Sequence, residues 1–352
     1  MSAPPPDRLV IRRPDDWHVH LRDGEMLRAV AGYTARQFAR AIVMPNLDPP
    51  VTSPAMAEGY RERIRAAAGD GGFTPLMTCY LTDDADPRVL AEGFRSGAWA
   101  AAKLYPANAT TNSARGVSHV RNIARVLEEM ERIGMPLLIH GEATDPEIDV
   151  FDREKAFIDR TFAGLARDFP ALKMVFEHIT TADAAHFVLG CGANVAATVT
   201  PQHLIINRNA LFAGGLRPHA YCLPVAKREE HRLAVRRAAT SGSPKFFLGT
   251  DSAPHGIERK ESGCGCAGIF NAPFALESYA TVFEEEGALD RFEAFASENG
   301  ALFYGLPLNE GRVVLERRET AVPDRLPAGA TRLVPFHAGE TLRWSFAGPY
   351  RA

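Results

Sequence analysis

Five residues of metal-binding type and one lysine stand at the ends of short apolar segments. They are His18 and His20 in DDWHVHLRDG, Lys103 in AAKLYPAN, His140 in LLIHGE, His178 in VFEHIT and Asp251 in FLGTDSAPH. Each should emerge at the carboxyl end of a strand, which is where β/α barrels build their active sites. Core packing alone explains such a dispersed set poorly. The pattern therefore predicts a metal-dependent hydrolase.

One residue separates His18 from His20, so both imidazoles face the same side of a strand and could bind one ion. The spacing alone is weak, because His-x-His is frequent by chance and two unrelated surface histidines are the ordinary explanation. His140, His178 and Asp251, taken singly, are each more often structural. All five together favour a metal site.

Lys103 is unusual in this set. An ammonium has three donors and no acceptor, so an unmodified lysine cannot ligate a metal, and neighbouring cations lower its pKa. The neutral amine could then react with carbon dioxide to form a carbamate, whose two oxygens can bridge two ions. By position alone, an ordinary lysine at a strand end is the simpler interpretation.

Eight strand-like segments alternate with helix-compatible ones. The strands are expected at 17–21, 41–46, 75–81, 98–105, 136–140, 173–178, 194–200 and 245–251. Helices are expected at 26–39, 54–68, 87–97, 117–134, 154–169 and 228–242. Continuously apolar strands between helices indicate a parallel sheet covered on both faces, and eight units predict closure into a TIM-type (β/α)8 barrel.

Two long connections, 201–244 and 254–273, should form loops on the catalytic face of this barrel. We expect a single domain from 1 to 352. Its barrel core should span about residues 15–304, and a short C-terminal extension should occupy 305–352.

Composition excludes several classes of protein. The 352 residues carry a formal net charge of −3, which gives no electrostatic reason to expect nucleic acid or an anionic membrane as partner. No apolar run is long enough to span a membrane, and the first residues show no secretory signal. The five cysteines are odd in number and lack zinc-ribbon spacing. A cytoplasmic location fits best.

Longer motifs extend the interpretation beyond the ligand pattern. The segments RRPDDWHVHLRDG, RAIVMPNLDPPVT, AAKLYPANATTN, RPHAYCLP, FLGTDSAPH and RKESGCGCAGIFNAP resemble those of the bacterial-type class II dihydroorotases of the amidohydrolase superfamily. The resemblance runs from about residue 8 to LVPFHAGETLRW near the C-terminus. Matches that include loops are far more specific than His-x-His, which implies only the superfamily.

The resemblance implies two zinc ions per subunit. His18, His20 and Asp251 would hold one ion, and His140 and His178 the other, with N6-carboxylated Lys103 and a hydroxide bridging the two. Nitrogen and oxygen ligands suit zinc and leave manganese and cobalt open. The resulting formal charge of about +1 would favour an anionic substrate.

The resemblance also implies the reaction. This is the reversible cyclisation of N-carbamoyl-L-aspartate to L-dihydroorotate in pyrimidine biosynthesis. The resemblance further implies a homodimer. Arg22 lies two residues beyond His20 and could hold the substrate carboxylate with two hydrogen bonds, although a surface salt bridge is the alternative. By resemblance, Asn46 and His255 complete this grip. The backbone groups of Leu223 and Ala267 would meet the ring amides.

Two further roles follow from the resemblance. Asp251 would take a proton from the nucleophile and return it to the amide nitrogen, acting as base and then as acid. The polar segment 106–116 would be a mobile lid whose Thr110 and Thr111 donate hydrogen bonds to the substrate. Composition alone is equally compatible with an ordinary solvent loop.

Two other functions remain open. Another cyclic amidase, such as a dihydropyrimidinase or allantoinase, is disfavoured because only sixteen residues precede the first expected strand, which leaves little for a composite sandwich domain. A carboxylate grip would also serve little purpose for neutral rings. A non-catalytic metal-binding homologue should have lost ligands, whereas all six positions here carry the expected residue.

Overall fold

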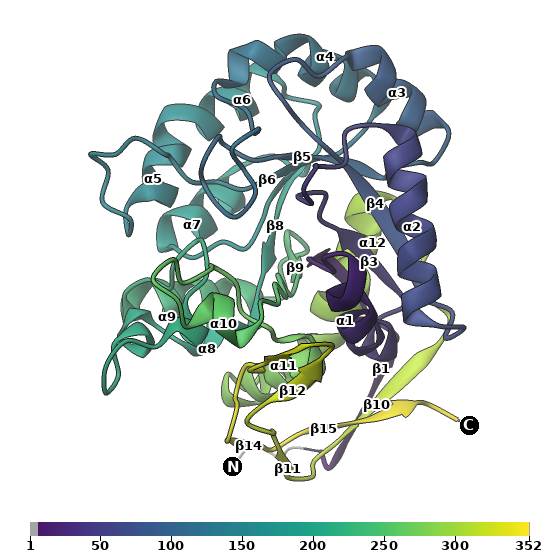
Figure 1. Cartoon of the computed structure of the whole chain (residues 1–352), viewed down its shortest axis with the longest axis vertical. Helices are drawn as coiled ribbons and strands as arrows, with labels where there is room; N and C mark the ends of the chain where they lie inside the picture. Colours follow the sequence, from purple (N-terminus) through teal and green to yellow (C-terminus); the bar gives the residue numbers. More distant parts are fainter. Residues whose placement is uncertain (1–5, 352) are drawn as a thin grey trace.

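Eight parallel strands run in sequence order around the centre of the molecule (Figure 1). The computed structural model describes residues 6–351. The strands are β2 (Asp15–Val19), β3 (Arg40–Val43), β4 (Thr74–Tyr80), β5 (Ala101–Leu104), β6 (Leu137–Ile139), β7 (Met174–Phe176), β8 (Val195–Val199) and β9 (Phe246–Leu248). All eight expected strands are present, and the predicted TIM-type barrel is confirmed.

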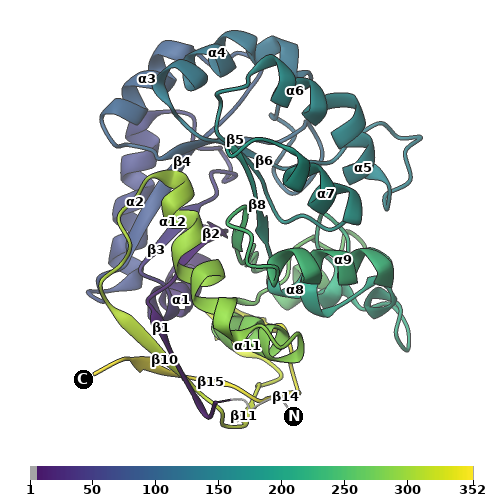
Figure 2. The same ribbon diagram turned by 180° about the vertical axis from the view of Figure 1, so that it is seen from behind.

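Helices surround the sheet, as Figures 1 and 2 show from opposite sides. They include α1 (Gly24–Gln37), α2 (Pro54–Ala68), α3 (Pro87–Arg95), α4 (Ala124–Ile133), α5 (Arg153–Phe157), α6 (Ala163–Asp168), α7 (Ala182–Gly190), α8 (Pro201–Ile205), α9 (Glu229–Ala239) and α11 (Ala275–Glu285). The six expected helices are present, although a π-helical turn at Ile158–Phe162 separates α5 from α6. Helices α7, α8 and α11 were not predicted.

The lower part of the barrel interior is apolar. Seven strands each contribute an inward residue to one buried cluster, which includes Trp17, Ile42, Ala101, Leu138, Val175, Ala196 and Phe247. Helix α12 (Asn299–Tyr304) packs beneath this cluster, where the Tyr304 ring stacks on Trp17 at a centroid separation of 4.5 Å (Figure 2). This apolar floor leaves the upper, carboxyl end of the strands for polar residues.

Local irregularities turn the polar side chains inward. Trp17 and His18 are consecutive, yet Trp17 packs in the apolar floor and His18 lies in the polar site above it. The pairing of β2 with β3 shifts register between Asp16 and Val19, and such a bulge re-aims side chains. His178 and Asp251 adopt left-handed backbone conformations with φ of 44° and 46°, which non-glycine residues rarely adopt.

Both ends of the described chain join outside the barrel. Strands β1 (Arg8–Arg12), β10 (Arg312–Glu316) and β15 (Ser345–Pro349) form a small antiparallel sheet in the order β1-β10-β15 (Figure 1). The short pairs β11 (Thr320–Ala321) with β14 (Thr341–Leu342) and β12 (Leu326–Ala328) with β13 (Thr331–Leu333) complete this region.

The expected single domain from 1 to 352 stays a prediction, and its residues 1–5 and 352 lie outside the described range. The prediction that the chain has no secretory signal also depends on residues 1–5, which lie outside the described range. Among residues 6–351, no helix is long and apolar enough to cross a membrane.

Gly249 leaves the space that His18 occupies. A Cβ atom at this position would lie 2.7 Å from Thr198 Cβ and 3.2 Å from His18 Cβ. We expect Gly249→Ala to lower the free energy of unfolding by about 1–3 kcal/mol, because overpacking a buried site forces its neighbours to move. Denaturant unfolding would measure this change.

Gly32→Ala in α1 is a suitable control, because nothing lies within 4 Å of its added Cβ. This variant should gain about 0.4–1 kcal/mol through reduced freedom of the unfolded chain. If Gly249→Ala unfolded at the same denaturant concentration as the parent chain, the close packing of Gly249 against His18 would not contribute to the free energy of unfolding.

Candidate active site

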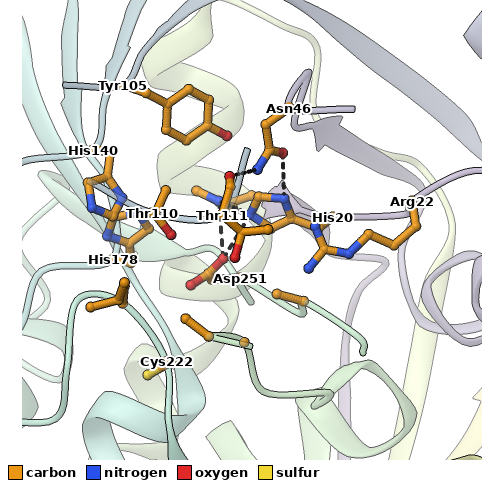
Figure 3. A pocket seen from close by; sticks show the side chains of 15 residues that line it. His20, Arg22, Asn46, Tyr105, Thr110, Thr111, His140, His178, Cys222 and Asp251 are labelled. Carbon is orange, nitrogen blue, oxygen red and sulfur yellow. Dashed lines mark hydrogen bonds and ion pairs between the residues drawn. The ribbon is translucent and has the colours of Figure 1, made fainter. Parts of the chain in front are cut away.

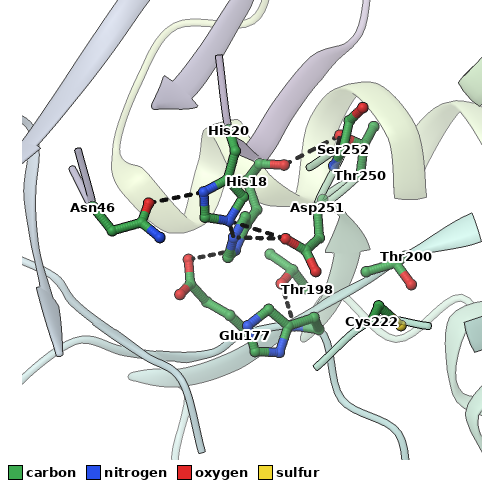
Figure 4. Close-up of polar contacts among 12 residues, drawn as sticks. His18, His20, Asn46, Glu177, Thr198, Thr200, Cys222, Thr250, Asp251 and Ser252 are labelled. Carbon is green, nitrogen blue, oxygen red and sulfur yellow. Dashed lines mark hydrogen bonds and ion pairs between the residues drawn. The ribbon is translucent and has the colours of Figure 1, made fainter. Parts of the chain in front are cut away.

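Three predicted metal ligands converge at the carboxyl ends of β2 and β9 (Figure 4). His18 Nε2 lies 3.3 Å from His20 Nε2 and 3.3 Å from Asp251 Oδ1, and His20 Nε2 lies 3.2 Å from the same carboxylate oxygen. Ligands that bind a tetrahedral zinc ion at about 2.0–2.1 Å are separated from one another by about 3.3–3.4 Å. The three atoms therefore fit one zinc ion.

The protonation states of His18, His20 and Asp251 depend strongly on one another and on nearby carboxylates. Burial alone would lower the pKa of His18, but the carboxylates of Glu177 and Asp251 outweigh burial and raise it to about 9. Burial lowers the pKa of His20 to about 4. Burial would raise the pKa of Asp251, yet its contacts with His18 and His20 hold it well below its usual range. The site thus keeps an ionised carboxylate that attracts a cation.

His140 and His178 lie beside this triangle. Their ring centroids are 4.8 Å apart, and the His178 ring is 5.0 Å from that of His18. His178 Nδ1 is buried and has no hydrogen-bond partner among the described residues, which leaves its lone pair available to a metal ion. His140 Nε2 lies 2.8 Å from Glu142 Oε2, a buried carboxylate that sequence reasoning missed.

Glu177 is a second residue that sequence reasoning missed. Its carboxylate forms an ion pair with Lys103 Nζ, and its other oxygen lies 3.0 Å from His18 Nδ1. Ligand atoms of His18, Glu177 and His178 all lie within 4.8 Å of one another, so this carboxylate belongs to a second group able to hold an ion. Inward alternation along β7, from Val175 to Glu177, was the sequence signal that could have revealed it.

Lys103 is fully buried at the end of β5, with its ammonium 4.6 Å from the centroid of the Tyr105 ring. Burial lowers the pKa of Lys103, although Glu177 opposes this shift. A lowered pKa makes the neutral amine more accessible, as carboxylation requires. Carboxylation of Lys103 stays a prediction.

Two residues of the predicted carboxylate grip, Arg22 and Asn46, line one side of the same pocket (Figure 3), and the third, His255, contacts Arg22. Arg22 Nη2 lies 2.9 Å from His255 Nε2, and its Nε donates to the Pro254 carbonyl at 3.1 Å. His255 Nε2 also lies 3.0 Å from the carbonyl oxygen of Ala267. Burial lowers the pKa of His255 to about 2, so this imidazole is neutral at physiological pH. Leu223 and Ala267 both line the pocket, as expected.

Asn46 links the metal ligands to the predicted lid. Its Oδ1 lies 2.9 Å from His20 Nδ1, and its Nδ2 donates to the carbonyl of Thr111 at 3.0 Å. Asn112 Nδ2 in turn donates to the Asn46 carbonyl at 3.0 Å. Thr110 and Thr111 line the pocket, and the remaining cavity measures about 20 Å³. The segment therefore covers the site in this structure (Figure 3).

Comparison with known proteins identifies the family. The model of the amidohydrolase family matches residues 11–314. A dihydroorotase of Sphingopyxis alaskensis is 68% identical over 339 residues, which cover 96% of this chain and 98% of the relative. A dihydroorotase of Erwinia tasmaniensis is 61% identical, with 96% and 98% covered. The chain belongs to the dihydroorotases of the amidohydrolase family. It is accordingly a cyclic amide hydrolase, and the predicted family and enzyme class are confirmed.

Solved structures agree with this assignment. The dihydroorotase of Saccharomyces cerevisiae in complex with 5-fluoroorotic acid is 32% identical and superimposes with a TM-score of 0.91, covering 98% of this chain and 100% of that one. The dihydroorotase of Campylobacter jejuni is 37% identical, with a TM-score of 0.89 and coverage of 97% and 98%. An L-hydantoinase of Arthrobacter aurescens, at 16% identity, shares the fold with a TM-score of 0.80, covering 97% and 84%.

The contact between Asn46 and the lid is testable. In Asn46→Asp, the side chain can still accept from His20 Nδ1 but can no longer donate to the Thr111 carbonyl. We expect trypsin to cleave the native chain after the exposed Arg115 about three- to tenfold faster, because one hydrogen bond is lost and two oxygens repel each other.

Asn194→Asp makes the same chemical change at a hydrogen bond from Asn194 Nδ2 to the Leu172 carbonyl at 2.8 Å, before β8 and far from the lid, and its rate of cleavage after Arg115 should match that of the parent chain. The measurement is a time course of cleavage followed by mass spectrometry. An unchanged rate for Asn46→Asp would show that Asn46 does not hold the lid.

Proposed function

We propose that this dihydroorotase interconverts N-carbamoyl-L-aspartate and L-dihydroorotate, a step of pyrimidine biosynthesis. The supporting observation is that one pocket is lined both by two residues of the carboxylate grip and by five of the predicted metal ligands. Arg22 and Asn46 lie on one side of it, His140 and His178 on the other, and Asp251 between them (Figure 3). A small anion with a reactive amide suits this arrangement.

The residues present fit two zinc ions. His18, His20 and Asp251 would hold one, and His140 and His178 the other, with carboxylated Lys103 between them. When bound, these ions would lower the pKa of a water molecule and polarise the substrate carbonyl. Converging lone pairs of His18, His20 and Asp251, together with the unpartnered Nδ1 of His178, support this assignment.

Asp251 would carry the proton. In hydrolysis, water adds to the ring carbonyl, the C–N bond breaks, and Asp251 transfers the water proton to the departing nitrogen. Its place in the pocket, beside His18 and His20 and between the two groups of pocket residues, supports this role. In cyclisation the same carboxyl group would donate its proton to the oxygen that leaves as water.

The other residues would bind and orient the substrate. Arg22, Asn46 and His255 would hold its carboxylate, while backbone groups of Leu223 and Ala267 would meet the ring amides. Closure of 106–116 over the pocket would exclude bulk water and bring Thr110 and Thr111 to the substrate. Such positioning favours a ring with a carboxylate over a neutral ring, because a neutral ring leaves the half-buried guanidinium of Arg22 without an anionic partner.

We also infer a cytoplasmic homodimer that acts on small molecules and binds neither nucleic acid nor membranes. The net charge of −3 supports the last two points. The dimer rests on resemblance to the family, and sedimentation velocity of the purified chain would test it.

The decisive assay compares two rings. With zinc present, L-dihydroorotate should be hydrolysed and dihydrouracil, which lacks the carboxylate, should not. Lys103→Ala should lose at least about a thousandfold in kcat, because it cannot form the carbamate that would join the two metal sites. Spectrophotometry of ring opening measures both rates.

Turnover of dihydrouracil would identify a broader cyclic amidase and would remove the role given to Arg22. Turnover of neither ring by metal-loaded protein would favour a non-catalytic homologue. Full activity of Lys103→Ala would exclude the carbamate.

The two directions should respond oppositely to pH. Cyclisation consumes one proton, since N-carbamoyl-L-aspartate has two carboxylates and L-dihydroorotate has one. Cyclisation requires protonated Asp251 and hydrolysis requires the ionised form. Between about pH 6 and about pH 9, kcat/KM should therefore fall for cyclisation, because protonated Asp251 becomes scarcer, and rise for hydrolysis, because bound zinc would bring the pKa of the attacking water to about 7. Initial rates in both directions test this, and parallel pH profiles would contradict the role of Asp251.

A further inference from the structure

The ammonium of Lys260 lies between two backbone segments that face the pocket. Lys260 ends the short helix α10 (Ile257–Lys260) and is only 2% exposed. Its Nζ donates to the carbonyls of Tyr221 at 2.9 Å, Cys266 at 2.8 Å and Gly268 at 2.8 Å. An ammonium has three protons, so this set of acceptors satisfies it completely.

These carbonyls are covalent neighbours of residues that line the pocket. Tyr221 precedes Cys222 and Leu223, and Ala267 lies between the other two acceptors. The carbonyls on either side of Ala267 accept from Lys260, whereas the Ala267 carbonyl lies 3.0 Å from His255 Nε2. The contacts of Lys260 therefore restrain the orientation of the peptide groups of 266–268.

The two segments have few other restraints between them. One follows β8 and the other follows β9, and a hydrogen bond from Gly268 N to the Tyr221 carbonyl at 3.0 Å joins them directly. Neither 221–223 nor 266–268 is part of a β-strand. Burial lowers the pKa of Lys260 to about 8, so the ammonium form still predominates at neutral pH.

We propose that Lys260 is a positioning residue for substrate recognition, which holds the backbone around Leu223 and Ala267 in the orientation that meets the ring amides. This inference rests on the proposed function, because those backbone groups are the ones assigned to the substrate. Lys260 itself contacts neither the metal ligands nor the predicted position of the substrate carboxylate.

Lys260→Met is the direct test, since methionine is unbranched and only one atom shorter than lysine but cannot donate to the three carbonyls. We expect the KM for L-dihydroorotate and the Kd for 5-fluoroorotic acid to rise at least about tenfold, with a smaller change in kcat. Zinc content should stay at the parental level. Steady-state kinetics, calorimetry and metal analysis give the three readouts.

The chain contains a matched control. Lys245 also donates to three carbonyls, those of Val188, Cys191 and Gly192, but it directly precedes β9, at the end of the barrel opposite the pocket. Lys245→Met likewise removes the donor of three carbonyls, so it should lower the melting temperature while leaving KM and Kd within about twofold of the parent. A merely structural role for Lys260 predicts equal effects of both variants on Kd, and that result would overturn the proposal.

Lys260→Arg covers the case in which the methionine variant does not fold. Arginine keeps the charge, but its planar donors cannot reach all three carbonyls in the same way, so Kd should rise about three- to tenfold. An unchanged Kd in either folded variant would also overturn the proposal. A parent chain that binds 5-fluoroorotic acid without turning over L-dihydroorotate would refute the proposed function alone. A parent chain that does neither would refute both proposals.

Discussion

The candidate site can form only when β9, the last strand of the barrel, lies beside β2, the first strand. The buried side chain of Asp16 holds the ends of these two strands together. Asp16 on β2 accepts hydrogen bonds from the backbone N and the hydroxyl of Thr250, at 2.8 Å and 2.6 Å. Asp251 N donates to the His18 carbonyl at 2.8 Å. Residues more than 230 positions apart in sequence thereby supply adjacent ligand atoms. Loss of this closure would separate Asp251 from His18 and His20.

The residues that stabilise the barrel and the residues of the candidate active site lie at different heights along the barrel axis. Trp17, Phe247 and Tyr304 fill the floor with close aromatic contacts, whereas the level above contains buried charges and unpartnered polar atoms. Unusual backbone conformations at His178 and Asp251 fall in this upper level, where strain is tolerated because the surrounding structure enforces it. The apolar floor therefore offsets the free energy that the polar site costs.

Much of this organisation could be predicted from the sequence, because buried parallel strands are continuously apolar and β/α barrels place functional residues at strand ends. Helix α2 was predicted with the bounds that the structure has, since Pro54 marks its start and Gly69 its end. Helix α7 was missed because its sequence is almost entirely apolar and lacks a polar face. Glu177 and Lys260 were missed because their roles depend on contacts between distant loops and strands.

The closed pocket constrains how the enzyme can bind a substrate. A cavity of about 20 Å³ holds about one water molecule, which is far less than a six-membered ring requires. Substrate entry must therefore displace the segment that carries Thr110 and Thr111. Asn46 connects this movement to the chemistry, because its amide joins the Thr111 carbonyl to His20, and a substrate carboxylate would compete for the same donor. In the proposed function, opening of the lid and capture of the substrate would therefore both involve the side-chain amide of Asn46.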